Sequence, residues 1–241
     1  MSDRNQQMIQ AIDLTKRFSD GRAAVNRLTF NVRPGEIYVL LGAPGSGKST
    51  VLSLFMNFIS PTSGVALIDG SNCTTQADAV KRVSAYVPEI SQSHETLSAW
   101  RYYSYLMRLG GKSGYGRNQS IRDLRESDLP EKVFDAPFSD LTPGMRQLLV
   151  LGSVMKRDAK AVLFDEPIAG MDARSVSLFI ARLRKLKEEG RAILIVTHDL
   201  LLSNQIADVV GILSQGVLSM EASAESKEVI RDVFLQTASF T

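Results

Sequence analysis

Cysteine, long apolar runs and an excess of one charge are all scarce in this sequence, and each scarcity excludes a class of protein. The 241 residues include a single cysteine, Cys73, so no intramolecular disulfide can form and no cysteine-based metal site is predicted, which favours a reducing compartment. No apolar run approaches the roughly 20 residues that span a bilayer, and residues 1–10 are too polar for a signal peptide. The net charge is +2, from 28 basic and 26 acidic residues, so no basic field indicates nucleic acid as a main partner. If the protein serves a membrane, we therefore expect it to act through a partner.

The apolar residues that are present form short runs separated by turns and helical patterns. Hydrophobic residues make up 44% of the chain, which is enough for a sizeable core in one large α/β domain. Residues 10–18 and 28–32 alternate apolar and polar side chains on either side of a turn, which predicts an antiparallel pair of strands. Residues 36–41, 161–164 and 192–196 are almost wholly apolar, as strands buried on both faces of a parallel sheet are. We therefore expect an α/β fold with a mainly parallel sheet.

One stretch fits the phosphate-binding loop pattern G-x-x-x-x-G-K-[ST]. It follows the strand expected at residues 36–41 and precedes a helix expected at residues 49–58, which is the order that the motif requires. Its members are Gly42, Ala43, Pro44, Gly45, Ser46, Gly47, Lys48, Ser49 and Thr50. The glycines let backbone N–H groups point at phosphate oxygens, Lys48 would reach the terminal phosphates of a nucleoside triphosphate, and the Ser49 hydroxyl would ligate Mg²⁺, with Thr50 as a second hydroxyl. The alternative is a glycine-rich turn that binds nothing.

Acidic and imidazole side chains follow two of the expected core strands. Asp165 and Glu166 come directly after residues 161–164, and His198 comes two residues after the run at 192–196. Ligands collect at the carboxyl ends of strands in open α/β sheets. Asp165 is therefore expected to hold Mg²⁺ or its water, Glu166 to accept a proton from an attacking water, and His198 to hydrogen-bond a terminal phosphate or that water. The alternatives are a solvated strand end and a histidine whose hydrogen bonds are satisfied within the fold.

One aromatic residue and one aromatic-rich segment each have two interpretations. Phe18 ends the first expected strand just before a turn, where its ring can lie against a base or pack in the core. Residues 97–109 form an expected helix with aromatic and methionine side chains on more than one face. Such a helix fits burial within the chain or a docking surface for a partner.

Taken together, these motifs resemble the nucleotide-binding domain of ABC transporters, in order and spacing and over essentially the whole chain. The matching segments are residues 42–50, Leu141-Thr142-Pro143-Gly144-Met145, the strand that ends in Asp165 and Glu166, Gly170-Met171-Asp172, and Thr197-His198. The resemblance implies one ABC-type ATPase domain over residues 1–241, with a P-loop NTPase core. It also implies an antiparallel β subdomain at residues 1–35 and a small helical subdomain at about residues 90–157 that includes the signature helix.

The resemblance implies a role for each matching side chain at the phosphate loop. Phe18 would stack on adenine and Lys48 would bind the phosphates of ATP. Asp165 would organise Mg²⁺ together with Ser49. Glu166 would be the general base and His198 the switch histidine.

The resemblance further implies a sandwich dimer in which each ATP lies between the loop of one subunit and the signature helix of the other. Thr142 and Gly144 would then contact the nucleotide bound by a second ABC ATPase subunit, identical or different, and Asp172 would be the D-loop aspartate. Clamping and release of ATP would drive integral membrane permease subunits. The chain would be peripheral at the cytoplasmic face of the membrane, held there through the permease.

Two positions depart from the family pattern. Glu89 stands where glutamine is usual, and a carboxylate only accepts hydrogen bonds, so it could bind Mg²⁺ but would repel the γ-phosphate without metal. Pro143 stands in the signature, where it removes one N–H and fixes φ. Thr142 and Pro143 are still typical of the N-cap and first residue of a helix, expected to run to residue 155. We expect ATP hydrolysis that is slowed by these two residues.

The leading interpretation is the ATPase subunit of an ABC exporter whose membrane subunits are separate chains. A soluble ABC ATPase that acts in assembly, such as the one in iron-sulfur cluster assembly, is the main alternative, and it would not co-purify with membrane proteins. A DNA-repair or chromosome-type ATPase would need a long heptad insertion, which is absent from the sequence. A P-loop kinase would leave residues 141–145 and His198 unexplained, and an importer ranks below an exporter.

The substitution Glu89→Gln tests the first departure from the pattern. An amide can donate as well as accept and carries no charge against the γ-phosphate, so we expect faster ATP turnover in the variant. The measurement is the steady-state rate of phosphate release at saturating ATP and Mg²⁺. A rate equal to or below that of the unmodified chain would contradict the interpretation.

Overall fold

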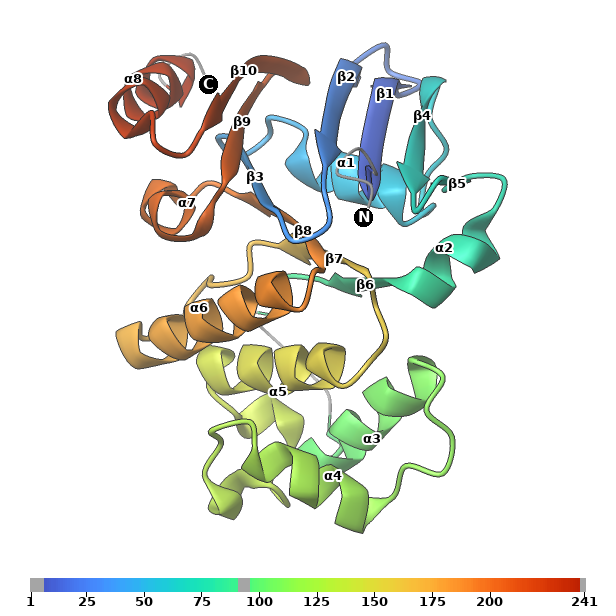
Figure 1. The fold of residues 1–241 in the computed structure, drawn as a ribbon, viewed down its shortest axis with the longest axis vertical. Helices are drawn as coiled ribbons and strands as arrows, with labels where there is room; N and C mark the ends of the chain where they lie inside the picture. Colours follow the sequence, from blue (N-terminus) through green and yellow to red (C-terminus); the bar gives the residue numbers. More distant parts are fainter. Residues whose placement is uncertain (1–6, 91–95, 239–241) are drawn as a thin grey trace, which may run out of the picture. The chain divides into compact units, whose positions relative to one another are not determined.

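The computed structural model describes residues 7–90 and 96–238, which fall into two compact units. Unit 1 comprises residues 1–86, 160–166 and 187–241, and unit 2 comprises residues 87–159 and 167–186. Each unit is assembled from segments that are distant along the chain. The helices and strands of both units are labelled in Figure 1.

Unit 1 contains a four-stranded antiparallel sheet in the order β2-β1-β4-β5. Its strands are β1 (Ile9–Arg17), β2 (Ala23–Val32), β4 (Ser63–Ile68) and β5 (Ser71–Asn72). The predicted pairing of the first two strands is confirmed, with Ile9 opposite Val32 and Leu14 opposite Leu28. The sheet extends past residue 35 because β4 pairs with the other edge of β1.

The second sheet has six strands in the order β10-β9-β3-β8-β7-β6. They are β3 (Ile37–Leu41), β6 (Ser84–Val87), β7 (Ala161–Asp165), β8 (Ala192–Thr197), β9 (Val209–Ser214) and β10 (Val217–Ser223). The pairs β3–β8, β3–β9 and β7–β8 are parallel, whereas β9 and β10 are antiparallel. Every residue of β3 and β8 is buried, which confirms the mainly parallel, doubly covered sheet that the apolar runs predict.

Helices cover both faces of this parallel sheet. They are α1 (Lys48–Phe55), α2 (Ala77–Val83), α7 (Leu200–Ile206) and α8 (Lys227–Ala238). Apolar residues of α1 pack in one cluster with residues of both sheets, so α1 is buried between them (Figure 1). On the other face, Leu41, Val210 and Ile212 pack against Ile230 of α8 and against Leu200 of α7. The loop between β3 and α1 is therefore fixed at both ends by buried elements.

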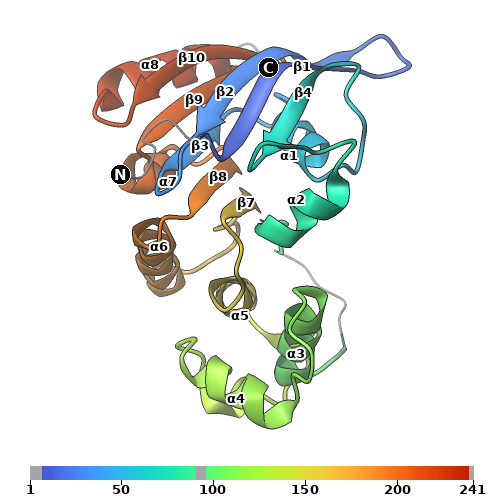
Figure 2. The same cartoon turned by 45° about the vertical axis from the view of Figure 1, so that its right-hand side comes forward.

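Unit 2 is built from helices. They are α3 (Ala99–Leu109), α4 (Arg117–Arg125), α5 (Pro143–Met155) and α6 (Ala173–Glu188), with two short 3₁₀ turns at Glu131–Val133 and Phe138–Asp140 (Figure 2). The guanidinium of Arg182 is buried and joins α6 to α5 by donating to the carbonyl of Leu148 (3.1 Å), and it also donates to the carboxylate of Asp128 (2.8 Å). Thr142 is the N-cap of α5, as the sequence predicts, because its hydroxyl accepts from the N–H of Met145 (3.3 Å).

The aromatic helix α3 is buried on one face and exposed on another. Tyr103 and Met107 are buried, whereas Tyr105 and Leu109 are 49% and 65% exposed. The helix begins two residues later than predicted because the carbonyl of Leu97 accepts from the N–H of Phe138 (2.8 Å) instead of starting a helical turn. One face of α3 is thus core, and docking of a partner on the exposed face stays a prediction.

Two phenylalanines near the end of α1 allow the core to be tested with a matched control. Phe55 is fully buried beside Phe30, with ring centroids 6.0 Å apart, whereas Phe58 is 64% exposed. We expect Phe55→Ala to lower the free energy of unfolding by about 3–5 kcal/mol, because a cavity is left between the two sheets. Phe58→Ala should cost about 1 kcal/mol or less, mainly the edge contact with Tyr86. Urea unfolding followed by circular dichroism measures both, and equal losses would contradict this description of the core.

Candidate functional site

The loop that joins β3 to α1 has the curled backbone expected of a phosphate cradle. Gly45 and Gly47 have φ values of 80° and 108°, a region that side chains rarely adopt. A Cβ at Gly47 would overlap the carbonyl oxygen of Ala24 in β2. On its other side the loop is fixed by the turn between β9 and β10, where the N–H of Gly216 donates to the carbonyl of Ser46 (2.9 Å). The curled shape is therefore imposed by neighbouring strands as well as by the glycines.

Lys48 is buried inside this loop and folded back on it. Its ammonium donates to the carbonyls of Gly42 (2.7 Å) and Ala43 (2.9 Å) and lies 4.0 Å from an oxygen of Glu166. Burial lowers the pKa of Lys48, and the carboxylates of Glu166 and Asp165 oppose that shift. The hydroxyl of Ser46 is buried with no hydrogen-bond partner among the described residues. A cation and an unsatisfied hydroxyl in a curled loop fit an anionic group such as a phosphate.

The side chains of Ser49 and Asp165 lie close together at the start of α1. The Ser49 hydroxyl lies 3.4 Å from a carboxylate oxygen of Asp165, at the end of β7. Both are hard oxygen ligands of the kind that Mg²⁺ prefers, and Mg²⁺ is usually bound by one or two protein groups together with substrate phosphates. Within the described part of the chain no group of three or more histidine, cysteine or acidic residues could hold a metal alone. The pair therefore fits a metal that arrives with a phosphate ligand.

Glu166 is the most constrained side chain of the site. Its φ is 41°, which is unusual for a residue other than glycine, and this conformation requires the surroundings to stabilise it. One carboxylate oxygen accepts from the hydroxyl of Thr197 (2.8 Å) and from the N–H of His198 (3.4 Å). The other oxygen lies 2.9 Å from Nδ1 of His198. The carboxylate is thus oriented by the end of β8, and it faces Lys48.

Phe18 lies directly after β1 and belongs to neither apolar cluster of unit 1. Its N–H donates to the carbonyl of Arg22 (2.9 Å), which closes the turn before β2. The side chains of Lys16 and Arg22 each lie 5.5 Å from the ring centroid. The half-buried ring therefore lies outside both apolar clusters with two cations nearby, and its stacking on a base stays a prediction.

The remaining predicted residues, Glu89, Thr142, Gly144 and Asp172, belong to unit 2, whereas the cluster around Lys48 belongs to unit 1. Asp172 accepts from the N–H (3.0 Å) and hydroxyl (2.7 Å) of Ser175, and these bonds lower the pKa of its carboxyl group. A Cβ at Gly144 would lie 2.5 Å from Cβ of Ser175, so only glycine permits this approach of α5 to α6. Glu89 is exposed.

Some residues that hold the site in place are only weakly indicated by the sequence. The sequence indicates Thr197 only as a polar strand end, and its bond to Glu166 depends on the pairing of β7 with β8. The contacts of the loop with Ala24 and Gly216 join positions that are far apart in the chain. Lys16 and Arg22 lie on either side of Phe18 in the sequence. A search for basic residues close to the expected base-stacking ring could have identified them.

Comparison with known families decides the identity of this arrangement. The ABC transporter family matches residues 25–169, which include the loop, the signature segment and the two carboxylates. This chain belongs to the ABC transporter family. It corresponds to the ATP-binding subunit and is an ATPase of the ABC type. Among residues 7–90 and 96–238, no helix combines the length and apolar character that crossing a membrane requires.

Curated relatives of this ABC subunit are similar over most of its length. The Nod factor export ATP-binding protein I of Burkholderia lata is 28% identical over 204 residues, which are 85% of this chain and 67% of that protein. The bacitracin transport ATP-binding protein BcrA of Enterococcus faecalis is 29% identical over 218 residues, which are 90% of this chain and 69% of that protein. Among solved structures, a dimeric post-hydrolysis state of the ATP-binding cassette MJ0796, bound to ADP and phosphate, has a TM-score of 0.78. It is 22% identical and covers 90% of this chain and 99% of that one, which confirms the P-loop NTPase fold.

The two loop glycines provide a test of how the ABC subunit holds its phosphate loop. Both have positive φ, but a Cβ at Gly45 would meet nothing within 4 Å, whereas one at Gly47 would overlap the backbone of β2. We expect Gly45→Ala to cost about 1–2 kcal/mol of stability through backbone strain alone. Gly47→Ala should cost about 2–5 kcal/mol, because an overpacking penalty of about 1–3 kcal/mol is added. Thermal unfolding of the two variants compares them, and equal melting temperatures would show that the contact with β2 is unimportant.

Proposed function

We propose that this subunit binds MgATP at the loop of unit 1 and hydrolyses it as one half of a dimer that powers export through separate membrane subunits. The observation that carries the proposal is the array in which Thr197 and His198 orient the Glu166 carboxylate beside the buried Lys48. A carboxylate fixed in this way at the end of a sheet strand is suited to accept a proton.

Binding would use groups that are held by the loop itself. The N–H groups of residues 42–50 and the ammonium of Lys48 would hold the phosphates, with Lys48 exchanging its two carbonyl partners for phosphate oxygens. Ser49 and Asp165 would hold Mg²⁺, which supplies charge neutralisation at the phosphates. Glu89 is a further candidate for the metal. Phe18 would stack on adenine, a contact that needs a ring face and no hydrogen-bonding code.

Hydrolysis would depend on the side chains at the ends of β7 and β8. Glu166 would take a proton from the attacking water. His198 would hydrogen-bond the terminal phosphate or that water, and its Nδ1 contact with Glu166 keeps the two groups together. Preorganised groups of this kind accelerate a reaction because they do not have to be oriented during the step.

The dimer is supported by the dimeric state of the related cassette structure and by the residues of unit 2. Thr142, Gly144 and Asp172 would act on the nucleotide bound by the second ATPase subunit. Pro143 carries no N–H, and the N–H of Met145 is already bonded to Thr142, so among the described residues 143–145 only Gly144 keeps a free N–H. A homodimer would contain this weakened signature twice, whereas a heterodimer could combine the complete loop of this chain with a stronger signature from a different subunit.

Export and the membrane partner are supported by the relatives and by the surface of α3. One relative is named for Nod factor export and another for bacitracin transport, both as ATP-binding proteins. The exposed face of α3, with Tyr105 and Leu109, would be available to permease subunits. On this proposal the chain is held at the cytoplasmic face of the membrane through the permease.

The substitution Glu166→Gln tests the proposal directly. We expect ATP turnover to fall by about 10²–10⁴-fold because an amide cannot act as general base, while ATP binding is retained. Glu225→Gln, at an exposed position before α8, is the matched control and should turn over like the unmodified chain. Phosphate release is measured with the chain alone and with proteins that co-purify from membranes. Turnover that survives Glu166→Gln would disprove the catalytic assignment, and brisk turnover with no membrane partner would favour an assembly ATPase.

A further inference from the structure

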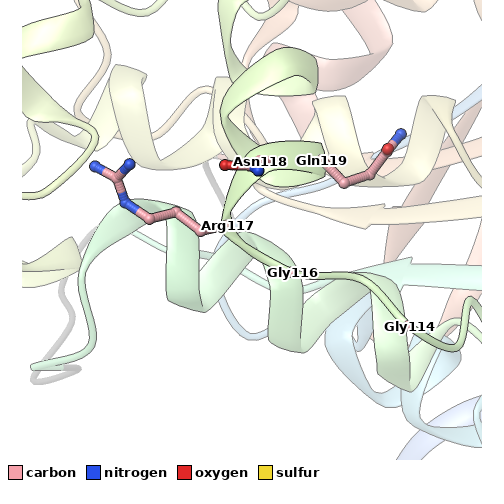
Figure 3. Close-up of a pocket in the computed structure, with 5 residues that line it drawn as sticks. All are labelled: Gly114, Gly116, Arg117, Asn118 and Gln119. Atoms are coloured by element: carbon pink, nitrogen blue, oxygen red, sulfur yellow. The ribbon is translucent and has the colours of Figure 1, made fainter.

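Among its described residues, unit 2 contains two hollows to which the proposed function assigns no ligand. The first, of about 350 Å³, lies at the start of α4 and is lined by Gly114, Gly116, Arg117, Asn118 and Gln119. Figure 3 shows the side chains of Arg117 and Gln119 pointing in opposite directions, so the polar groups do not converge on one point. The guanidinium of Arg117 is moreover paired with Asp135 (2.9 Å). This hollow lacks the convergent polar groups that define a ligand site.

The second hollow has the size and wall of a small-molecule site. Its volume is about 560 Å³, and pockets that hold small ligands typically measure about 300–1,000 Å³. It is enclosed by the first turns of α5 and α6 and by residues 128–130. Most of its wall is apolar, with Leu129, Met145, Leu148 and Leu178 as the main contributors. An apolar wall of this extent favours a ligand with an apolar body.

The polar residues of the wall are bonded within unit 2, with one exception. Asp128 accepts from Arg182 (2.8 Å), Asp172 accepts from Ser175 (2.7 Å), and the hydroxyl of Thr142 accepts from the N–H of Met145 (3.3 Å). The guanidinium of Arg174 has no hydrogen-bond or ion-pair partner among the described residues, and it lies at the wall of the hollow. An arginine presents several N–H donors in a fixed geometry that suits carboxylate, sulfonate or phosphate groups.

We propose that this hollow binds a small amphipathic anion, with its apolar body between α5 and α6 and its charged group on Arg174. The two nearby carboxylates do not oppose this, because Asp128 is neutralised by Arg182 and Asp172 is stabilised by the N–H and hydroxyl of Ser175. The charge of the ligand is thus selected by Arg174, an exposed side chain whose guanidinium has no partner among the described residues. The apolar wall selects a body of a few rings or a short alkyl chain.

Such a ligand would regulate the ATPase, a consequence that rests on the proposed function. Thr142 and Asp172 line the hollow and are the residues that we assign to the nucleotide of the second subunit. A molecule bound beside them would change how the first turns of α5 and α6 meet that subunit. Binding of the anion needs no nucleotide, so it can be measured separately from its effect on ATP turnover.

The probe for the experiment is 8-anilinonaphthalene-1-sulfonate, an anion with three aromatic rings and a sulfonate that stays ionised over the working pH range. Its fluorescence is titrated with the full chain in the absence of nucleotide. We expect saturable binding at one site and a dissociation constant about tenfold larger in Arg174→Gln, which removes the charge and keeps the length of the side chain. Leu178→Trp, which fills the hollow with an indole, should abolish binding, and circular dichroism verifies that it folds. The matched control Arg184→Gln, on the same helix outside the wall, should bind like the unmodified chain.

Each other outcome overturns part of this inference. If Arg174→Gln binds as tightly as the unmodified chain, or folded Leu178→Trp still binds, the dye occupies another surface and the site is disproved. If ATP-induced dimers of Glu166→Gln bind the dye with unchanged affinity, the ligand does not affect contact with the second subunit and the regulatory consequence is disproved. Regulation requires the dye to change the turnover of the unmodified chain but not that of Arg174→Gln, and equal responses disprove it. Dye binding without any Glu166-dependent turnover would disprove the proposed function and leave the binding site in place.

Discussion

The parallel pairing of β8 with β3 on one side and β7 on the other is the constraint on which the site depends. Leu41 is the register partner of Thr197, and Asp165 is the partner of Val196, so the three strands end at the same level. Each strand is then followed by a group with a different chemistry: the phosphate loop, the Asp165–Glu166 pair and the Thr197–His198 pair. A one-residue slip would move every side chain to the opposite face of the sheet. The full burial of β3 and β8 makes such a slip costly and so fixes the distances between these groups.

Strain and burial at the site are stabilised by that same sheet. Glu166 has a positive φ, and Lys48 is an ammonium removed from water, and each is unfavourable alone. Glu166 is stabilised by Thr197 and His198, and Lys48 by the carbonyls of its own loop. The loop carbonyls are poor substitutes for an anion. A phosphate would therefore replace two neutral carbonyl partners of Lys48 with an anionic one.

The sequence predicts most of the fold because the signals are local. Strands buried on both faces require continuous apolar runs, so β3, β7 and β8 can be recognised as buried strands from the sequence. The strand β5 is missed because two residues carry no periodicity, and the start of α3 is displaced by a bond from Phe138 to Leu97 that joins distant positions. The site follows the same division. Motif residues such as Lys48 are predictable, whereas the φ of Glu166 and the contact of the loop with Ala24 are consequences of tertiary packing.

In the first turn of α5, the same backbone N–H groups can either stabilise the helix or bind an anion, and the two uses compete. A serine or threonine N-cap stabilises a helix by about 0.5–2 kcal/mol, and here the Thr142 hydroxyl does so by accepting from the N–H of Met145. That N–H is then unavailable to an anion, and Pro143, which favours the helical conformation at the first position, contributes no donor. The signature segment of this chain therefore begins a well-capped helix that presents few donors. On the proposed dimer, these donors serve the nucleotide of the other subunit, so we expect the difference to weaken the partner's site more than the site built on Lys48 and Glu166.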